Sequence, residues 1–502
     1  MIDFLNALND LMWGKPFIIF VMMVGLIFTL QGGFFTISRF GHIMKHTLGS
    51  LTSKEANKKE AGRVSPFEAV CVAIGGTVGA ANIGGVATAI ATGGPGAVFW
   101  MWLWAFFGMM VKLVETTLGC YYRSQDEKGN YYGGSMYFME KGIGREQGKK
   151  AGFVLAGIFS LCFLLQAVQG SQAYTISEVL YAAFGFDMIL VTCLYTVLVY
   201  FVIWRGTPRI AKIATKAVPF MCLIYLIGGL AIIGANITSI PGVFVLIFRE
   251  AFTGSAAFGG FIGATVAKAM NAGVSRSMNS NEAGMGSSPL IHGSADTIHP
   301  MRQGLWGAFE VFIDTIVVCS ITALSILCTG AYQSGSAGAT LTIEAFTSVF
   351  GNFAASYIGI MVLLFGFTTT AGWYVYYVTV IGYALRHQPV IRDKIINIFK
   401  IMFPMMNVII VSYIVLTGSG ADLFWTIVSI VTAPSVFINL IALLFLRKKF
   451  FAIFKDYQAR YLGKGKVDPQ YYVFYEDDPA IAEKEEAIRE EIRRKNHIAY
   501  TG

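Results

Sequence analysis

The sequence has little charge and no recognisable catalytic cluster. Asp, Glu, Lys and Arg make up 14% of its 502 residues, whereas a soluble domain carries about 25%. The six His are scattered, and the sequence contains no Ser-His-Asp, HExxH or Walker pattern, so nothing indicates an enzyme or an ATP-driven pump. The seven Cys all lie in apolar segments without metal-ligand spacing. We expect no disulfide, no metal site of that kind and no cofactor.

Long apolar segments fill most of the chain instead. Hydrophobic residues reach 55% and the mean hydropathy is +0.60, which is typical of an all-α polytopic membrane protein. The first apolar run, from Phe17 to Leu30, lacks the flanking residues of a cleaved signal peptide. Eleven transmembrane helices are predicted, at about 16–37, 66–92, 97–123, 151–181, 187–204, 214–236, 241–278, 303–330, 352–385, 396–416 and 422–446.

The cationic residues predict the orientation of these helices. The net charge is +8, and nearly all loop cations fall on one side of the membrane, which the positive-inside rule makes the cytosol. We therefore expect a multi-pass protein of the plasma or inner membrane with its N-terminus outside and its C-terminus in the cytosol. The basic residues at 447–449 favour contact with anionic lipid headgroups rather than nucleic acid. The cation-bearing loops are 39–65, 124–150, 205–216, 279–302, 386–400 and the tail.

A glycine-rich stretch over 75–85 interrupts the second apolar segment. Ser65 and Glu68 form a capping-box pattern at its start, and glycine inside a helix costs about 1 kcal/mol relative to alanine. Such a stretch predicts either a broken helix that lines a cavity or close packing of two helices through small residues. A second glycine interruption is predicted at 254–260.

These two interruptions divide the chain. Residues 66–236 and 237–446 would each form five helices that begin with a glycine-broken one and start from opposite sides of the membrane, as inverted repeats do. Residues 1–65 hold an extra helix and a basic loop, and 447–502 form a cytosolic tail with a solvated helix over 483–494.

Several motifs resemble those of the sodium:alanine/glycine symporter family. They span the chain from 65 to 385, and they are Gly79–Ile90, Gly93–Trp102, Ser280–Ser287, His299–Gly304, Phe312–Thr315 and Phe367–Tyr374. The resemblance implies a LeuT-like fold of five plus five helices with one extra N-terminal helix, and the import of a small neutral amino acid, alanine or glycine, together with sodium. Two departures lie near the expected pocket: Gly79-Ala80-Ala81-Asn82 where the family reads Gly-Thr-Gly-Asn, and Leu164–Gln169 where the family has Gly-Asn-Met-Val-Gln.

The resemblance also implies a binding site. The solute is expected to contact Gly79, Asn82, Gln169, Thr369 and Trp373, with its carboxylate at free amides of the break. Sodium is expected at the carbonyls of Gly75, Gly76 and Val78 and the hydroxyls of Thr368 and Thr369. For Asn82 the alternative is a hydrogen bond between helices, Gln166 or Gln172 could take the place of Gln169, and on periodicity alone Thr369 and Trp373 are core residues.

Charged residues within the apolar segments suggest further roles. Asp314 is a candidate cation or proton site, or the partner of a nearby donor. Lys112 and Glu115, one turn apart, are expected to pair with each other.

The second half holds a candidate gate. Asn281, Glu282 and Arg302 flank the cytosolic end of the second broken segment. A gate role and a loop-ordering salt bridge are both open. Proton coupling, or glutamine or another neutral amino acid as substrate, is the alternative function, and a channel is the less favoured one.

Overall fold

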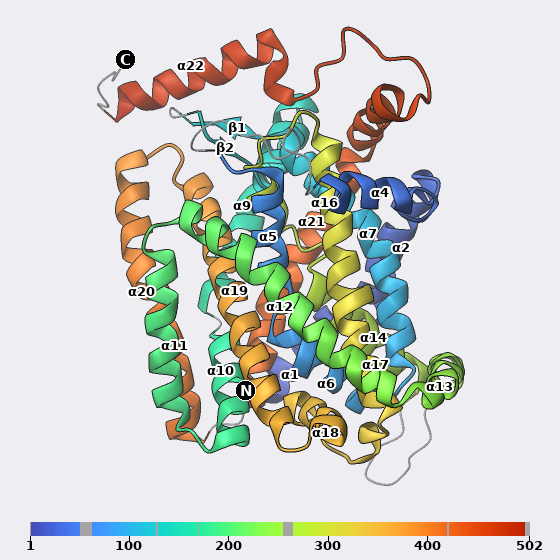
Figure 1. Cartoon of the computed structure of the whole chain (residues 1–502). Helices are drawn as coiled ribbons and strands as arrows, with labels where there is room; N and C mark the ends of the chain where they lie inside the picture. Colours follow the sequence, from blue (N-terminus) through green and yellow to red (C-terminus); the bar gives the residue numbers. More distant parts are fainter. Residues whose placement is uncertain are drawn as a thin grey trace.

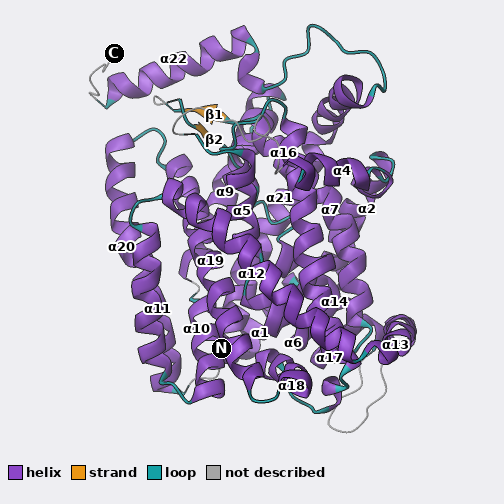
Figure 2. Ribbon diagram, in the orientation of Figure 1, coloured by secondary structure: helices purple, strands orange, loops and turns teal. Residues whose placement is uncertain are grey.

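The computed structural model describes residues 2–50, 63–126, 129–168, 170–254, 265–418 and 421–496. Within these ranges the chain is a bundle of long helices with one short β-hairpin (Figures 1 and 2). The expectation of an all-α membrane protein is therefore confirmed. The elements are α1 (Ile2–Met12), α2 (Lys15–Gln31), α3 (Phe35–Ser38), α4 (Phe40–His46), α5 (Pro66–Thr77), α6 (Val86–Gly93), α7 (Ala97–Tyr121), β1 (Ser124–Gln125), β2 (Tyr131–Tyr132), α8 (Ser135–Tyr137), α9 (Ala151–Leu165), α10 (Ser171–Phe184), α11 (Met188–Ile203), α12 (Thr207–Ala235), α13 (Ile240–Thr253), α14 (Val266–Asn281), α15 (Pro289–His292), α16 (Pro300–Val311), α17 (Ser320–Cys328), α18 (Gly338–Phe350), α19 (Phe353–Ala384), α20 (Pro389–Thr417), α21 (Ala421–Leu462) and α22 (Pro479–Lys495).

Many of these helices suit a lipid environment. Seven stretches of the described chain are helical, long and apolar enough to cross a membrane, and the bent pair α5 and α6 makes an eighth. Two shorter apolar helices, α9 and α11, accompany them. Large apolar side chains such as Leu198, Phe201 and Leu223 lie exposed on the outside of the bundle, as a surface in contact with lipid requires. The total of eleven crossings stays a prediction.

The break that follows α5 organises the interior. The helix starts with the predicted capping box: Ser65 Oγ accepts from the Glu68 N–H at 3.1 Å, and Glu68 Oε2 accepts from the Ser65 N–H at 2.8 Å. It ends at Thr77, and the chain bends by 51° before resuming at Ala81 as a π-helical turn that leads into α6. An interruption therefore lies inside the glycine-rich stretch, at residues 78–80.

The second expected interruption, 254–260, lies outside the described residues apart from Gly254, which ends α13. The described chain breaks elsewhere, between α14 and α15. Glu282 there has a φ of +55°, a value uncommon for a residue with a side chain, and Gly284 and Gly286 follow with φ of +85° and +79°. The expectation of a cytosolic loop over 279–302 is wrong for this part, because residues 280–293 are buried inside the bundle.

Two further expectations need correction. The single helix expected over 151–181 is two helices, because α9 ends at Leu165 and α10 begins only after Gly170, whose φ of +50° favours glycine. The polar loop expected over 124–150 is ordered as the β1–β2 hairpin, α8 and a π-helical segment over 138–146. In the first case the chain breaks where composition indicated a continuous helix. In the second it forms strands and helical segments where composition indicated a loop.

The tail is docked rather than free. α21 continues to Leu462, past the expected end at 446, and α22 covers the helix expected over 483–494. Glu476, just before α22, accepts a hydrogen bond from Lys141 Nζ at 2.7 Å and one from Ser124 Oγ at 2.9 Å. Figure 2 shows α22 lying across the end of the bundle that carries the hairpin, while α13 and α18 lie at the other end.

Candidate functional site

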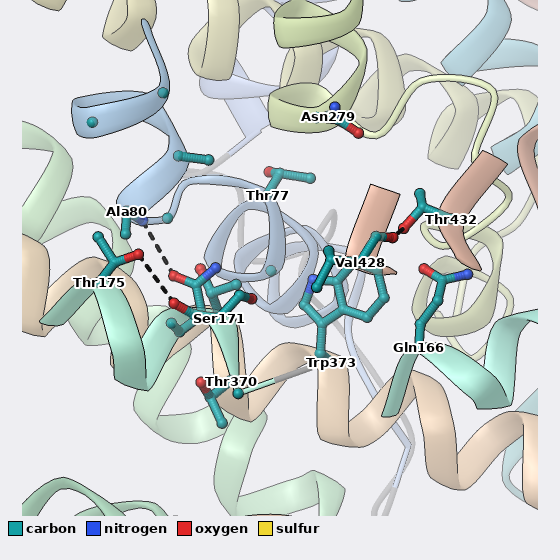
Figure 3. Close-up of a pocket in the computed structure, with 18 of the residues that line it drawn as sticks. Thr77, Ala80, Gln166, Ser171, Thr175, Asn279, Thr370, Trp373, Val428 and Thr432 are labelled. Atoms are coloured by element: carbon teal, nitrogen blue, oxygen red, sulfur yellow. Dashed lines mark hydrogen bonds between the residues drawn. The ribbon is translucent and has the colours of Figure 1, made fainter. Parts of the chain in front are cut away.

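A cavity of about 570 Å³ lies beside the break after α5. Its walls come from that break, from α10, α14 and α19, and from parts of α20 and α21 (Figure 3). The volume falls within the range of about 300–1,000 Å³ that small-molecule sites occupy. The lining is mixed in character, because small residues of the break face Trp373 and several amide and hydroxyl side chains.

Three oxygens converge at the break on one side of this cavity. Thr369 Oγ1, on α19, lies 3.0 Å from the carbonyl oxygen of Gly75 and 3.3 Å from that of Val78. The Gly75 carbonyl has lost its usual helical donor, since the N–H of Gly79 donates instead to Asn82 Oδ1 at 2.8 Å. The break thus frees backbone oxygens, and α19 supplies a hydroxyl to them.

Glycines allow α19 to come this close. A Cβ added at Gly79 would lie 2.7 Å from Thr369 Oγ1, and one added at Gly372 would lie 3.0 Å from the Cα of Gly76. Gly76 itself faces the hydroxyl of Tyr376, which would be 2.7 Å from an added Cβ. The glycine-rich stretch therefore serves both readings offered by the sequence, a broken helix beside a cavity and close helix packing.

Thr368, the other hydroxyl expected at the ion, is turned toward its own helix. Its Oγ1 donates to the carbonyl oxygens of Phe365 at 3.0 Å and Leu364 at 3.2 Å.

Asn82 is engaged inside the protein. It is fully buried, its Oδ1 accepts from Gly79, and its Nδ2 donates to Asp314 Oδ1 at 2.6 Å. Asp314 also accepts from Ser280 Oγ at 3.2 Å and Thr315 Oγ1 at 2.8 Å. In this structure Asn82 makes the alternative contact that the sequence offered, a hydrogen bond between helices, and Asp314 has its donors close by. A contact of Asn82 with the solute stays a prediction.

The glutamines of the fourth segment divide between several positions. Gln169 lies outside the described residues. Gln172, on α10, lines the cavity, and its Oε1 accepts from the N–H of Ala80 at 3.3 Å (Figure 3). Gln166 lines the cavity as well and donates to Ser435 Oγ at 3.0 Å. Trp373 forms the expected wall, stacked on Phe163 at 5.6 Å between ring centroids.

A buried charged network holds the second break. Lys112 Nζ pairs with Glu310 Oε1 at 3.2 Å and donates to the carbonyl of Asn281 at 2.8 Å. Glu115 accepts from the N–H of Gly286 at 3.3 Å and from other neighbours. The expected pairing of Lys112 with Glu115 is wrong. The N–H groups of Gly284 and Gly286 at the second break donate to Glu115, and Glu310 on α16 forms the ion pair with Lys112.

The three residues expected at a gate do not come together. Asn281 and Glu282 are buried, and Ser287 Oγ donates to Glu282. Arg302 lies over the ring of Tyr461 at 4.9 Å, at the end of α21. A loop-ordering role fits Asn281 and Glu282 in this state.

Other residues of the cavity had no assigned role in the sequence. Arg276, Asn279 and Glu178 line it, with Asn407 and Thr432. The signal that points to Arg276 is a cation within a membrane-embedded segment, which marks a functional residue by default. Among the described residues, no group of three or more His, Cys, Asp or Glu is arranged to hold a metal ion.

Comparison with known proteins decides the family. A model described as the sodium:alanine symporter family matches residues 1–471. The chain belongs to the sodium:alanine symporter family. This member is 36% identical over 471 residues to the probable sodium/glutamine symporter GlnT of Bacillus subtilis, covering 93% of this chain and 92% of that one. It is 34% identical over 452 residues to the sodium/alanine symporter AgcS of Methanococcus maripaludis, covering 89% and 94%.

The fold of this family member also matches solved transporters. A Na⁺-coupled sialic acid symporter in a substrate-bound, outward-open state superposes with a TM-score of 0.56 at 13% identity, over 90% of this chain and 92% of that one. At that identity the match establishes the LeuT-like fold alone. The protein is a multi-pass, cation-coupled amino-acid symporter, and not an enzyme.

Proposed function

We propose that the protein is a sodium-coupled symporter that imports a small neutral amino acid, alanine or glycine, by alternating access. The observation that carries the proposal is the convergence of the Gly75 and Val78 carbonyl oxygens with Thr369 Oγ1, at 3.0 and 3.3 Å. Sodium is a hard cation that prefers oxygen ligands. Backbone oxygens freed by a broken membrane helix are the groups with which transporters of this type hold their coupling ion.

In this proposal sodium binds between α5 and α19. Thr369 then offers its oxygen lone pair to the ion instead of its proton to the two carbonyls. The carbonyl of Gly76 and the hydroxyl of Thr368 are the remaining candidate ligands. The ion is cargo that moves with the solute, so its downhill entry supplies the energy for uptake.

The solute occupies the neighbouring cavity. Ala80 offers an N–H group at the break, where Gln172 Oε1 now accepts at 3.3 Å, and an anionic group would displace that amide because it is the stronger acceptor. Trp373 provides an apolar wall for a small side chain. Gly79 and Asn82 contribute by fixing the break, and Gln169 remains a proposed contact.

The proposed transport cycle uses two inverted repeats. Residues 66–236 and 237–446 form them, after an extra segment over 1–65 and before the tail over 447–502. The cytosolic side is the one that carries the hairpin and α22, with the N-terminus outside. Asp314, Asn281, Glu282 and Arg302 remain candidates for a second cation or proton site and for the cytosolic gate.

A larger or more polar substrate, such as glutamine, is the second candidate. Two observations favour it: Asn279 and Gln166 both line the cavity beside Asn407, and one relative is named as a probable sodium/glutamine symporter. Amide side chains in the wall can pair with an amide of the solute.

Uptake into vesicles tests the proposal. Purified protein in lipid vesicles should accumulate labelled alanine under an inward sodium gradient, and should not do so when potassium replaces sodium. Competition by the twenty amino acids then separates alanine and glycine from glutamine. Uptake that follows a proton gradient without sodium contradicts sodium coupling, and currents above carrier rates contradict a symporter.

A further inference from the structure

The cavity is lined by a guanidinium for which the described residues provide no hydrogen bond and no ion pair. Arg276 lies on α14 and lines the cavity. Its Nε is buried without a hydrogen-bond partner, and no described residue forms an ion pair with it. Lys112, another buried cation, is by contrast paired with Glu310 at 3.2 Å. An unpaired buried charge is costly, so a chain that keeps one in a membrane-embedded cavity has a use for it.

The neighbouring backbone is shaped around this side chain. Gly85, in the π-helical turn after the break, faces the guanidinium directly: an added Cβ would lie 1.9 Å from Arg276 Nη1 and 2.3 Å from Cζ. Glycine at 85 therefore leaves the space that the planar group occupies. The position of the charge is set by two elements, α14 and the turn that starts α6.

The two backbone donors at the break each have an internal acceptor in this state, which an incoming anion would first have to displace. The N–H of Gly79 donates to Asn82 Oδ1 at 2.8 Å, and that of Ala80 donates to Gln172 Oε1 at 3.3 Å. Of these three groups, only Arg276 has donors for which the described residues provide no acceptor. A guanidinium binds a carboxylate through two parallel hydrogen bonds, a geometry that Lys cannot reproduce.

Carboxylates of the protein do not fill this role in the described chain. Glu178 lines the same cavity from α10, but its Oε1 accepts from the hydroxyl of Tyr174 at 3.1 Å and forms no described ion pair with Arg276. Asp314 is supplied by donors from Asn82, Ser280 and Thr315. The described residues therefore supply no counter-ion for Arg276.

We propose that Arg276 binds a carboxylate of the transported solute. This inference rests on the proposed function and names the chemical group that the cavity recognises. Both the α-carboxylate of a neutral amino acid and the side-chain carboxylate of an acidic one have the required chemistry. Binding pairs the guanidinium with an opposite charge inside the cavity.

Equilibrium binding of labelled alanine to the purified protein in sodium tests the proposal. R276Q removes the charge and should raise Kd by about 10- to 100-fold, the effect of losing one charge-assisted hydrogen-bonded pair. R276K keeps the charge without the fork and should fall in between. G85A should weaken binding in the same direction, because its Cβ displaces the guanidinium. Arg249 is an exposed arginine outside the cavity, so R249Q is the matched control and should bind alanine like the wild type.

Competitors distinguish the two carboxylates. If the α-carboxylate is bound, wild-type protein should prefer alanine over alaninamide and R276Q should lose that preference. If the side-chain carboxylate is bound, the lost preference should be that for aspartate over asparagine. A rise in the melting temperature of R276Q when sodium is added shows that this variant is folded. If R276Q does not fold, G85A and R276K provide the test independently.

The outcomes are separable. Wild-type protein that binds no amino acid overturns the proposed function, and this inference with it. Wild-type protein that binds alanine, with R276Q equally tight and equally selective against both competitors, overturns the role of Arg276 alone.

Discussion

Replacing Thr369 with Val tests the candidate cation site most directly. Valine keeps the branched shape of threonine but removes the hydroxyl that meets the Gly75 and Val78 carbonyls at 3.0 and 3.3 Å. Thr369 is 4% exposed, so water does not readily replace the lost group. A buried polar group left without its partner costs about 1–3 kcal/mol. Since about 1.4 kcal/mol is a tenfold change, the sodium concentration for half-maximal uptake should rise roughly 5- to 150-fold.

The assay is uptake of labelled alanine into vesicles at graded sodium concentrations and constant ionic strength. T369S keeps the hydroxyl and should stay close to the wild type. T379V is the matched control, because Thr379 lies on the same helix and its hydroxyl donates to the carbonyl of Val375 at 2.9 Å. An unchanged sodium dependence in T369V refutes the placement of the ion between α5 and α19.

Three further substitutions probe the surrounding structure. Gly79→Ala places a Cβ 2.7 Å from Thr369 Oγ1, so we expect a higher sodium concentration for half-maximal uptake. Overpacking should also lower the free energy of unfolding by about 1–3 kcal/mol, measured as a lower melting temperature. Lys112→Met removes the ammonium that pairs with the fully buried Glu310 and leaves this carboxylate only its contacts with Ser288 and His292. We expect a loss of about 3–5 kcal/mol, seen as poor recovery of folded protein by size-exclusion chromatography; normal recovery contradicts the pairing. Burial by itself would raise the pKa of Glu476, but Lys141, Arg489 and the hydrogen bond from Ser124 together hold that pKa below its ordinary value. The contact is therefore fully present above the ordinary Glu pKa of about 4.3 and is lost as pH falls through the lowered one. Hydrogen exchange at the hairpin should increase in that acidic window, and Glu476→Gln should show the increase already at neutral pH.

Local signals in the sequence were sufficient for the first break. The capping box at Ser65 joins residues three positions apart, so the start of α5 depends on nothing distant. The glycines at 75–85 likewise lower the local helix propensity, which depends on no distant residue. Both features are present in the structure at those residues.

Distant partners decided the features that the sequence did not predict. Gln172 meets Ala80 across 92 positions, and Lys112 selects Glu310 over Glu115 because α16 packs beside α7. The break after Asn281 was hidden for the same reason. Its polar, glycine-containing motif has the composition of a surface loop, and only burial against α7 and α21 turns it into part of the interior.

Asp314 accepts hydrogen bonds from both of the interrupted segments at one point. A single oxygen, Oδ1, accepts from Asn82, just after the first break, at 2.6 Å and from Ser280, just before the second, at 3.2 Å. The two breaks thus share one hydrogen-bond acceptor, although they lie in different halves of the chain. A substitution that removes that oxygen would therefore remove a hydrogen bond at both breaks at once.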